Sequence, residues 1–282
     1  MPQTTKLPTH SLGRTGFEVT LFGLGGEGVL RSYGQESEAR KVIQRALDLG
    51  VNYFDSAPAY AGCLDYYGAC LGERRTEVFL ASKTADRTRD GSLTLLDATL
   101  RRLRSDYLDL WQLHDVRTRT EVKQVFSSDG AIHALLQARA EGRVRHVGIT
   151  GHHNPAVLVE AMEQFDFDTV LIPLNCADVH RLSFVREVLP VARAKGTGVI
   201  AMKVYSAGLL ATPSSECGAE DALRYALSLD GVACAIVGCR TTVEVEDNAR
   251  IVREFTLLSD HRRTELEARH SEKHWTPYKM GH

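Results

Sequence analysis

Eight short apolar runs recur along this chain at nearly even spacing, and this regularity limits its fold more than any other feature. Their C-terminal ends lie 25 to 36 residues apart, the length of one strand followed by one helix. Most are apolar nearly throughout, as strands covered on both faces are. The predicted strands are Val19–Gly25, Val51–Ser56, Glu77–Lys83, Tyr107–His114, Val144–Thr150, Thr169–Asn175, Gly198–Lys203 and Val232–Gly238.

Segments with helical periodicity fill the intervals. Glu36–Leu49 places its apolar residues on one face, and Gly50 follows as a helix stop. Eight strand–helix units without a break in composition predict a single α/β domain over residues 1–282, a (β/α)8 TIM barrel; a doubly wound open sheet is the alternative. The other predicted helices are Leu93–Leu103, Ala131–Glu141, Pro155–Phe165, Phe184–Ala194 and Ala219–Leu229.

Two segments lie outside the eight units. Residues 12–20 carry Gly16 between two short extended stretches, which predicts an N-terminal β-hairpin that closes the bottom of the barrel. Residues 255–282 are polar and charged, and we expect a solvated C-terminal helix and tail. The histidines of this extension match no metal-ligand spacing.

The composition excludes several classes of protein. With 34 Lys+Arg, 36 Asp+Glu and a net charge of −2, the chain has no basic surface for nucleic acid or membrane. No apolar run reaches the roughly 20 residues of a membrane span. The segment MPQTTKLPTH is not a signal peptide, and the six cysteines contain no Cys-x-x-Cys pair. We therefore expect a cytoplasmic protein, and the oligomeric state is not predicted.

Four chemically useful residues follow the ends of three neighbouring predicted strands. Asp55 ends the second strand with Tyr60 just beyond it, Lys83 ends the third, and His114 ends the fourth. Each residue also has a purely structural interpretation. Asp55 could cap a turn and Tyr60 could be a loop aromatic, while Lys83 could lie at the rim and His114 could be a core histidine. Together they occupy equivalent positions at the end of a barrel where active sites gather.

These four side chains suit proton transfer to an oxygen. A free phenol has a pKa of about 10, and a nearby ammonium lowers it. We expect Lys83 to lower the pKa of Tyr60, Asp55 to hold Lys83, and His114 to orient a substrate oxygen. The group contains no nucleophile–base pair for acyl transfer and no set of ligands for a catalytic metal.

Four segments carry a resemblance to a known family. GVNYFDSAPAY, FLASKT, LRRLRSDYLDLWQLH and IVGCRTTVEVEDN resemble the aldo-keto reductase family in order and spacing, from about Leu12 to Phe255. The resemblance implies a (β/α)8 barrel that interconverts carbonyls and alcohols with NAD(P)H. It also implies that Asp55, Tyr60, Lys83 and His114 are the catalytic tetrad, with Tyr60 as general acid or base.

The same resemblance assigns the dinucleotide site, with departures from the family pattern. Gly151 replaces an asparagine that would contact the nicotinamide carboxamide, Leu171 replaces a glutamine, and Met202 replaces a stacking aromatic. Lys203–Leu209 resembles the pyrophosphate loop. The implied cofactor-binding residues are Gly25, Gly26, Thr150, Asn175, Lys203, Ser206, Gly208, Leu209, Gly238, Arg240, Glu244 and Asn248.

Glu244 bears on which dinucleotide is used. The family favours NADP(H), but a carboxylate at this position would repel a 2′-phosphate and could accept a 2′-hydroxyl instead. Arg240 could offset that charge, so we favour NADP(H) and keep NAD(H) as possible.

The substrate pocket is expected near Glu27 and His152. His152 and His153 are adjacent, so we expect their side chains to diverge and no metal site to form there. Arg117, Arg119 and Lys123, in the loop after the fourth strand, suggest an anionic or polyhydroxylated small molecule or simply a solvated loop. The predicted function is a carbonyl–alcohol oxidoreductase, with a nucleotide-binding sensor or a redox-neutral isomerase as alternatives.

Overall fold

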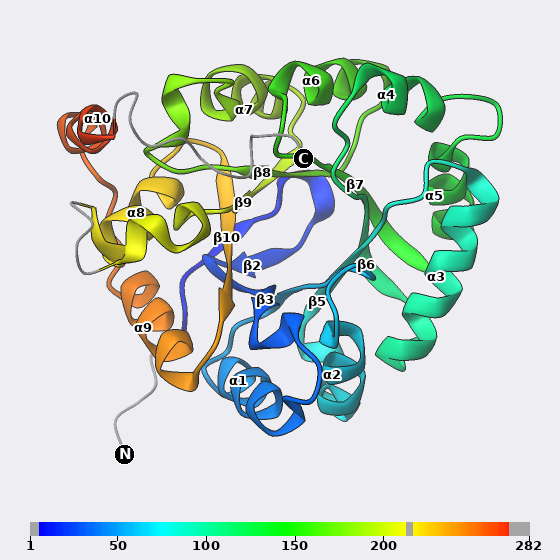
Figure 1. The fold of residues 1–282 in the computed structure, drawn as a ribbon, viewed down its shortest axis with the longest axis horizontal. Helices are drawn as coiled ribbons and strands as arrows, with labels where there is room; N and C mark the ends of the chain where they lie inside the picture. The colour runs from blue at the N-terminus through cyan, green and yellow to red at the C-terminus, as the bar shows by residue number, and fades with distance from the viewer. Residues whose placement is uncertain (1–5, 213–216, 271–282) are drawn as a thin grey trace.

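A closed barrel of eight parallel strands forms the centre of the computed structural model, which describes residues 6–212 and 217–270 (Figure 1). The strands follow one another around the barrel in chain order, and the last pairs with the first. This confirms the predicted TIM barrel. The strands are β3 (Phe22–Gly28), β4 (Tyr53–Asp55), β5 (Phe79–Thr84), β6 (Leu108–Leu113), β7 (Val144–Thr150), β8 (Thr169–Pro173), β9 (Gly198–Met202) and β10 (Val232–Cys239).

Helices cover the outside of the barrel (Figure 1). Three of them, α2, α4 and α9, are absent from the predicted helices. In α2 five of eight residues are buried, so no polar face marks it as a helix. The α-helices are α1 (Glu36–Asp48), α2 (Cys63–Cys70), α3 (Arg89–Leu103), α4 (Arg119–Val125), α5 (Ala131–Ala140), α6 (Pro155–Gln164), α7 (Phe184–Ala194), α8 (Gly218–Leu227), α9 (Thr242–Arg253) and α10 (Asp260–Arg269).

Short 3-10 helices occupy several of the connections. They are η1 (Gly13–Thr15), η2 (Val29–Arg31), η3 (Gly72–Glu77), η4 (Asp178–His180) and η5 (Ser206–Ala211). Three of these, η2, η4 and η5, follow β3, β8 and β9 at the carboxyl end of the barrel. That is the end at which barrel enzymes place their active sites.

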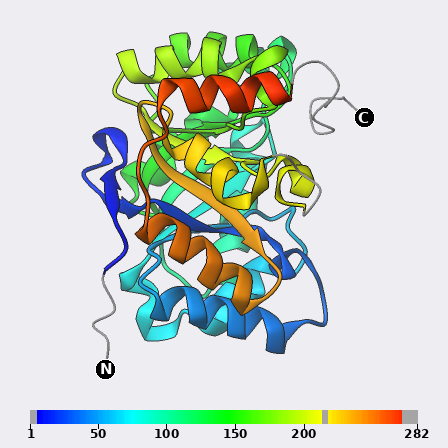
Figure 2. The ribbon, with the colours of Figure 1, turned by 90° about the vertical axis from the view of Figure 1, so that its left-hand side faces the viewer.

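A hairpin seals the opposite end of the barrel. Strands β1 (Thr9–Ser11) and β2 (Glu18–Thr20) pair antiparallel, so the hairpin begins three residues before the predicted start. The Phe17 ring packs against Phe79, at the amino end of β5, with centroids 4.9 Å apart. Figure 1 shows the hairpin across the barrel centre, and Figure 2 shows it at one end. The hairpin does not cover the carboxyl end, where barrel enzymes place their active sites.

The hairpin also explains an error in the first predicted strand. Val19–Gly25 combines the end of β2 with the start of β3, because only Leu21 separates the two strands. The turn at Gly16 has φ of 76°, a conformation that glycine adopts without strain.

The C-terminal extension begins with the expected helix, α10. Its Glu267 accepts a hydrogen bond from the Tyr225 hydroxyl at 2.6 Å, which fixes α10 against α8. The rest of the predicted tail, residues 271–282, lies outside the described residues. No helix in the described part of the chain is long and apolar enough to cross a membrane.

Candidate active site

The ends of β4 and β5 hold a buried ion pair. Lys83 Nζ donates to Asp55 Oδ2 at 2.6 Å and to the Ser56 carbonyl at 2.8 Å. Both charged side chains are only 1% exposed. Burial raises the pKa of the Asp55 carboxyl, and the nearby ammonium opposes that shift. The structure therefore brings Asp55 and Lys83 together as the sequence indicated.

Tyr60 lies over this pair, in the loop that leaves β4. Lys83 Nζ is 4.9 Å from the centre of the Tyr60 ring, and the His114 ring meets it edge-on with centroids 5.8 Å apart. The four predicted residues thus form one group. Arg31 was not predicted, yet its guanidinium carbon lies 5.3 Å from the centre of the same ring.

The protonation of Tyr60 differs from the sequence-based expectation. Burial raises its pKa well above that of a free tyrosine, and the Asp55 and Glu27 carboxylates act in the same direction. Arg31 opposes them. Proximity to an ammonium therefore does not lower this pKa, because the cost of burying a phenolate is larger. Tyr60 is a protonated phenol, ready to donate.

His114 is held by its backbone on both sides. Its N–H donates to the Thr84 carbonyl at 2.8 Å, and its carbonyl accepts from Arg87 Nη2 at 2.8 Å. Burial, followed by the positive charge of Lys83, lowers the pKa of the imidazole to about 3. A neutral ring next to Tyr60 can donate one N–H to a substrate oxygen.

Glycines at the end of β3 allow the backbone to pass close to this group. A Cβ on Gly26 would lie 2.6 Å from Tyr60 Cδ2 and 2.8 Å from the Asp55 carbonyl oxygen. A Cβ on Gly25 would lie 3.0 Å from the Val237 carbonyl carbon. Gly26 is therefore required for the position of Tyr60, whereas the contact of either glycine with a dinucleotide stays a prediction.

A charged rim joins β3 to the loop after β9. Glu27 Oε1 accepts from Lys203 Nζ at 3.1 Å and from Arg31 Nη1 at 3.2 Å. Burial acts to raise the pKa of Glu27, but these cations outweigh it and the pKa is lowered. Glu27 and Lys203, predicted separately for substrate and cofactor, thus contact each other across the mouth of the barrel.

The loop after β9 adopts a run of left-handed conformations. Ser206, Ala207 and Gly208 have φ of 47°, 56° and 97°. Ala207, Gly208 and Leu209 are exposed, and a Cβ on Gly208 would meet nothing within 4 Å. Within this turn the Ser206 N–H donates to the Lys203 carbonyl at 2.7 Å and the Gly208 N–H donates to the Tyr205 carbonyl at 2.9 Å.

Two residues predicted to contact the cofactor also hold the strand ends in place. The Thr150 hydroxyl oxygen accepts from the Asp115 N–H at 2.8 Å. Asn175 is fully buried; its amide donates to the Lys203 carbonyl at 2.9 Å and accepts from the Ala177 N–H at 3.1 Å. Asn175 therefore shapes the turn that carries Lys203.

The turn between β10 and α9 contains the last predicted group. Glu244 accepts from the Arg240 N–H at 2.6 Å, so its carboxylate lies at the amino end of α9. Asn248 donates to the Glu244 carbonyl at 2.7 Å and accepts from the Tyr205 hydroxyl. Gly238 packs closely on Glu27, because a Cβ there would lie 2.7 Å from Glu27 Cβ. Tyr205 had not been predicted.

A family model for "Aldo/keto reductase family" matches residues 21–216. The chain belongs to this family. L-galactose dehydrogenase of Arabidopsis thaliana is 27% identical, with 94% of each chain covered. Pyridoxal 4-dehydrogenase of Microbacterium luteolum is 25% identical, covering 77% of this chain and 75% of the relative.

Solved structures agree with the fold of this aldo/keto reductase. An aldo-keto reductase from Bacillus halodurans, in its holo form, superimposes with a TM-score of 0.81 at 23% identity. The match covers 97% of this chain and 100% of the other. The barrel and its order of strands are therefore those of the family.

The residues predicted to hold a dinucleotide differ in how well they fit one. The loop at residues 206–208 is exposed at Ala207 and Gly208, and Lys203 adds a positive charge beside it, although the Ser206 and Gly208 N–H groups already bind backbone carbonyls. Asn175 is buried and also bonded to the protein backbone, and Glu244 occupies the amino end of α9. The phosphate loop and the tetrad are thus the residues that fit the cofactor most directly.

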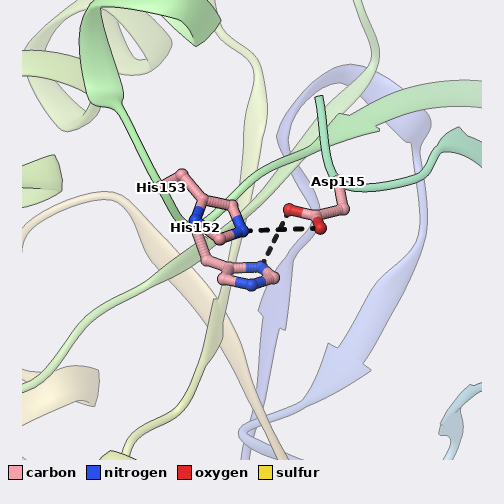
Figure 3. Close-up of side chains that lie close together, drawn as sticks. All are labelled: Asp115, His152 and His153. Atoms are coloured by element: carbon pink, nitrogen blue, oxygen red, sulfur yellow. Dashed lines mark ion pairs between the residues drawn. The ribbon is translucent and has the colours of Figure 1, made fainter. Parts of the chain in front are cut away.

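One prediction about the loop after β7 is wrong. His152 and His153 do not diverge: His152 Nδ1 lies 3.1 Å from Asp115 Oδ1, and His153 Nε2 lies 3.6 Å from Asp115 Oδ2 (Figure 3). The chain bends at these residues instead of running extended, so consecutive side chains converge. Asp115 had been missed, although it directly follows His114.

Burial lowers the pKa of both histidines of this cluster, that of His152 to about 4. Burial acts to raise the pKa of Asp115, but His152 and then Arg117 outweigh it and the pKa is lowered. Arg117 also binds this carboxylate, with Nε 2.7 Å from Oδ2.

Proposed function

We propose that this chain is an NAD(P)H-dependent oxidoreductase that interconverts a small carbonyl compound and its alcohol. The family and relatives named as dehydrogenases support an oxidoreductase. The observation that carries the proposal is the placement of a protonated Tyr60 between the Lys83 ammonium and a neutral His114. This is the arrangement that protonation of a carbonyl oxygen requires.

Each of these residues has a separate task in reduction. A dinucleotide held at this end of the barrel would supply the hydride for the carbonyl carbon. Tyr60 donates its proton to the oxygen as negative charge develops there, and His114 orients that oxygen through a ring N–H. Lys83 stabilises the phenolate that Tyr60 becomes, and Asp55 keeps Lys83 charged and in place. Oxidation of the alcohol uses the same steps in reverse.

The rim charges support a small polyhydroxylated substrate. Glu27, Lys203 and Arg31 present both acceptors and donors within reach of the mouth. Two relatives have sugar names, L-galactose dehydrogenase and, at 26% identity, D-threo-aldose 1-dehydrogenase of a Pseudomonas species. Arg117 and Arg119 are paired with Asp115 and Glu160, just as Lys203 and Arg31 are paired with Glu27, so the names of the relatives are the stronger support. An aldose is the substrate class we propose.

The position of Glu244 supports NAD(H) over NADP(H), against the preference drawn from the family resemblance. Its carboxylate accepts the Arg240 N–H at the amino end of α9, a place where an anion would otherwise be stabilised by the helix. A 2′-phosphate brought to this helix end would meet a negative charge, whereas a 2′-hydroxyl would meet an acceptor.

A matched pair of tyrosine variants tests the proposal. Oxidation of a panel of aldoses with NAD⁺ and NADP⁺, and reduction of aldehydes with NADH and NADPH, should show turnover by the wild type. Tyr60→Phe should lower kcat by about a hundredfold or more while the dinucleotide still binds. Tyr33→Phe, at a tyrosine that is 75% exposed, should leave kcat unchanged. Equal turnover by wild type and Tyr60→Phe would refute the role of Tyr60.

A further inference from the structure

A second group of chemically active side chains lies beside the tetrad and has no part in the proposed reaction. Asp115 comes two residues after β6, and His152 and His153 come just after β7. These strands are neighbours in the barrel, so their carboxyl ends meet. The Asp115 N–H bonds the Thr150 hydroxyl oxygen at 2.8 Å, and the Val116 N–H bonds the Thr150 carbonyl at 2.8 Å. The backbone that carries the group is therefore anchored.

The three side chains turn toward a common point. One ring nitrogen from each histidine and a carboxylate oxygen of Asp115 all lie within 4.8 Å of one another. Figure 3 shows both rings turned toward the carboxylate. The side chains are 12% to 21% exposed, so the group is shielded from bulk water and still reachable from the mouth of the barrel.

The structure assigns a metal site to this group, and we propose that it binds one divalent first-row transition metal, Zn²⁺ above all. Two imidazole nitrogens and one carboxylate oxygen are the donor set that suits zinc, whereas calcium and magnesium prefer oxygen ligands alone. Three protein ligands leave a further coordination position for water.

Arg117 sets a limit on the strength of binding. It binds Asp115 Oδ2, while Asp115 Oδ1 faces His152. Asp115 can therefore bind a metal through Oδ1 and keep Arg117 on its other oxygen. Carboxylates that bind metals are often oriented in this way by a hydrogen bond from a neighbouring side chain. The guanidinium also places a positive charge near the ion, which opposes binding. We accordingly expect micromolar affinity rather than the tight binding of a structural zinc site.

Zinc titration of the metal-free full chain tests this inference without any measurement of turnover. Calorimetry should show one saturable Zn²⁺ per wild-type chain, and Co²⁺ should give the visible absorption of a nitrogen–oxygen site. Asp115→Asn and His152→Asn should each weaken Zn²⁺ binding by tenfold or more. Asp115 has φ of 52°, a conformation that asparagine tolerates, so this variant should keep the backbone.

The control for this titration is another histidine of the same barrel. His133→Asn changes an exposed histidine of α5 and should leave Zn²⁺ binding unchanged. Thermal unfolding of each variant establishes that it is folded, and Zn²⁺ should raise the wild-type midpoint but not that of Asp115→Asn. Absence of saturable binding in the wild type, or equal affinity in wild type and His152→Asn, would overturn the site.

Discussion

The buried pair of Asp55 and Lys83 gives a prediction about stability that does not depend on the reaction. Nζ and Oδ2 are 2.6 Å apart, and both side chains are 1% exposed. Replacing one partner, as in Asp55→Asn or Lys83→Met, leaves the other charge buried and unpaired. Such a change costs about 3–5 kcal/mol in the free energy of unfolding.

The double variant Asp55→Asn/Lys83→Met removes both charges at once. It should cost clearly less than the sum of the single variants, with a coupling of about 2 kcal/mol or more. Urea unfolding, followed by circular dichroism and by tryptophan fluorescence, measures the three free energies. The slope with urea should stay constant across the set, so that the midpoints report stability alone.

A surface pair of nearly equal length is the control for burial. Lys41 Nζ and Glu38 Oε1 are 2.7 Å apart on α1, with side chains 59% and 52% exposed. Lys41→Met should change stability by no more than about 0.5 kcal/mol. If Lys83→Met cost as little as Lys41→Met, or if the Asp55 and Lys83 changes were additive, burial would not be the source of the effect.

The destabilisation caused by Lys83→Met should depend on pH, and the direction of this dependence follows from the pKa of Asp55. Burial raises the pKa of Asp55, and Lys83→Met removes the cation that opposes this shift. A carboxyl whose folded-state pKa lies above its unfolded value of about 3.9 stabilises the fold below that value and loses this contribution as the pH rises. The cost of Lys83→Met should therefore grow from acid to neutral pH.

Three further changes test the site. Below pH ~10 the wild type and Tyr60→Phe should show the same phenolate absorbance, because the raised pKa keeps Tyr60 protonated. A lower phenolate absorbance in Tyr60→Phe near neutral pH would contradict this. Glu244→Gln should raise the NADPH/NADH ratio of kcat/KM roughly fivefold, worth about 1 kcal/mol, and an unchanged ratio would show that the carboxylate lies away from the 2′ position. Gly26→Ala should lower kcat about tenfold, because its Cβ would meet Tyr60 at 2.6 Å, and full activity would refute that requirement.

The barrel and the tetrad could be predicted because both follow from periodic signals. Strands buried on two faces read as apolar runs, and their even spacing gave the topology. Strand ends then placed Asp55, Lys83 and His114 at one end of the barrel. The structure confirms the barrel and brings these residues together, whereas their catalytic roles are proposals.

Local geometry limited the rest of the prediction. The convergence of His152 and His153 depends on a bend after β7, which two adjacent histidines do not specify. The contact between Glu27 and Lys203 joins residues from opposite parts of the chain that only barrel closure brings together. The family resemblance assigns Asn175 to the cofactor because Leu171 replaces the usual glutamine, and the sequence does not indicate that the Asn175 amide bonds the backbone of the next turn.

The pKa of Tyr60 shows why chemistry at this site needs both burial and charge. Burial, followed by the Asp55 and Glu27 carboxylates, raises the pKa of the phenol and keeps the proton on Tyr60. The same burial would oppose the phenolate that forms when the proton leaves. In the proposed reaction Lys83, 4.9 Å from the centre of the ring and fixed by Asp55, supplies positive charge beside the ring that becomes negative. On this proposal its contribution is larger in the transition state than in the ground state, which is the condition for accelerating the step.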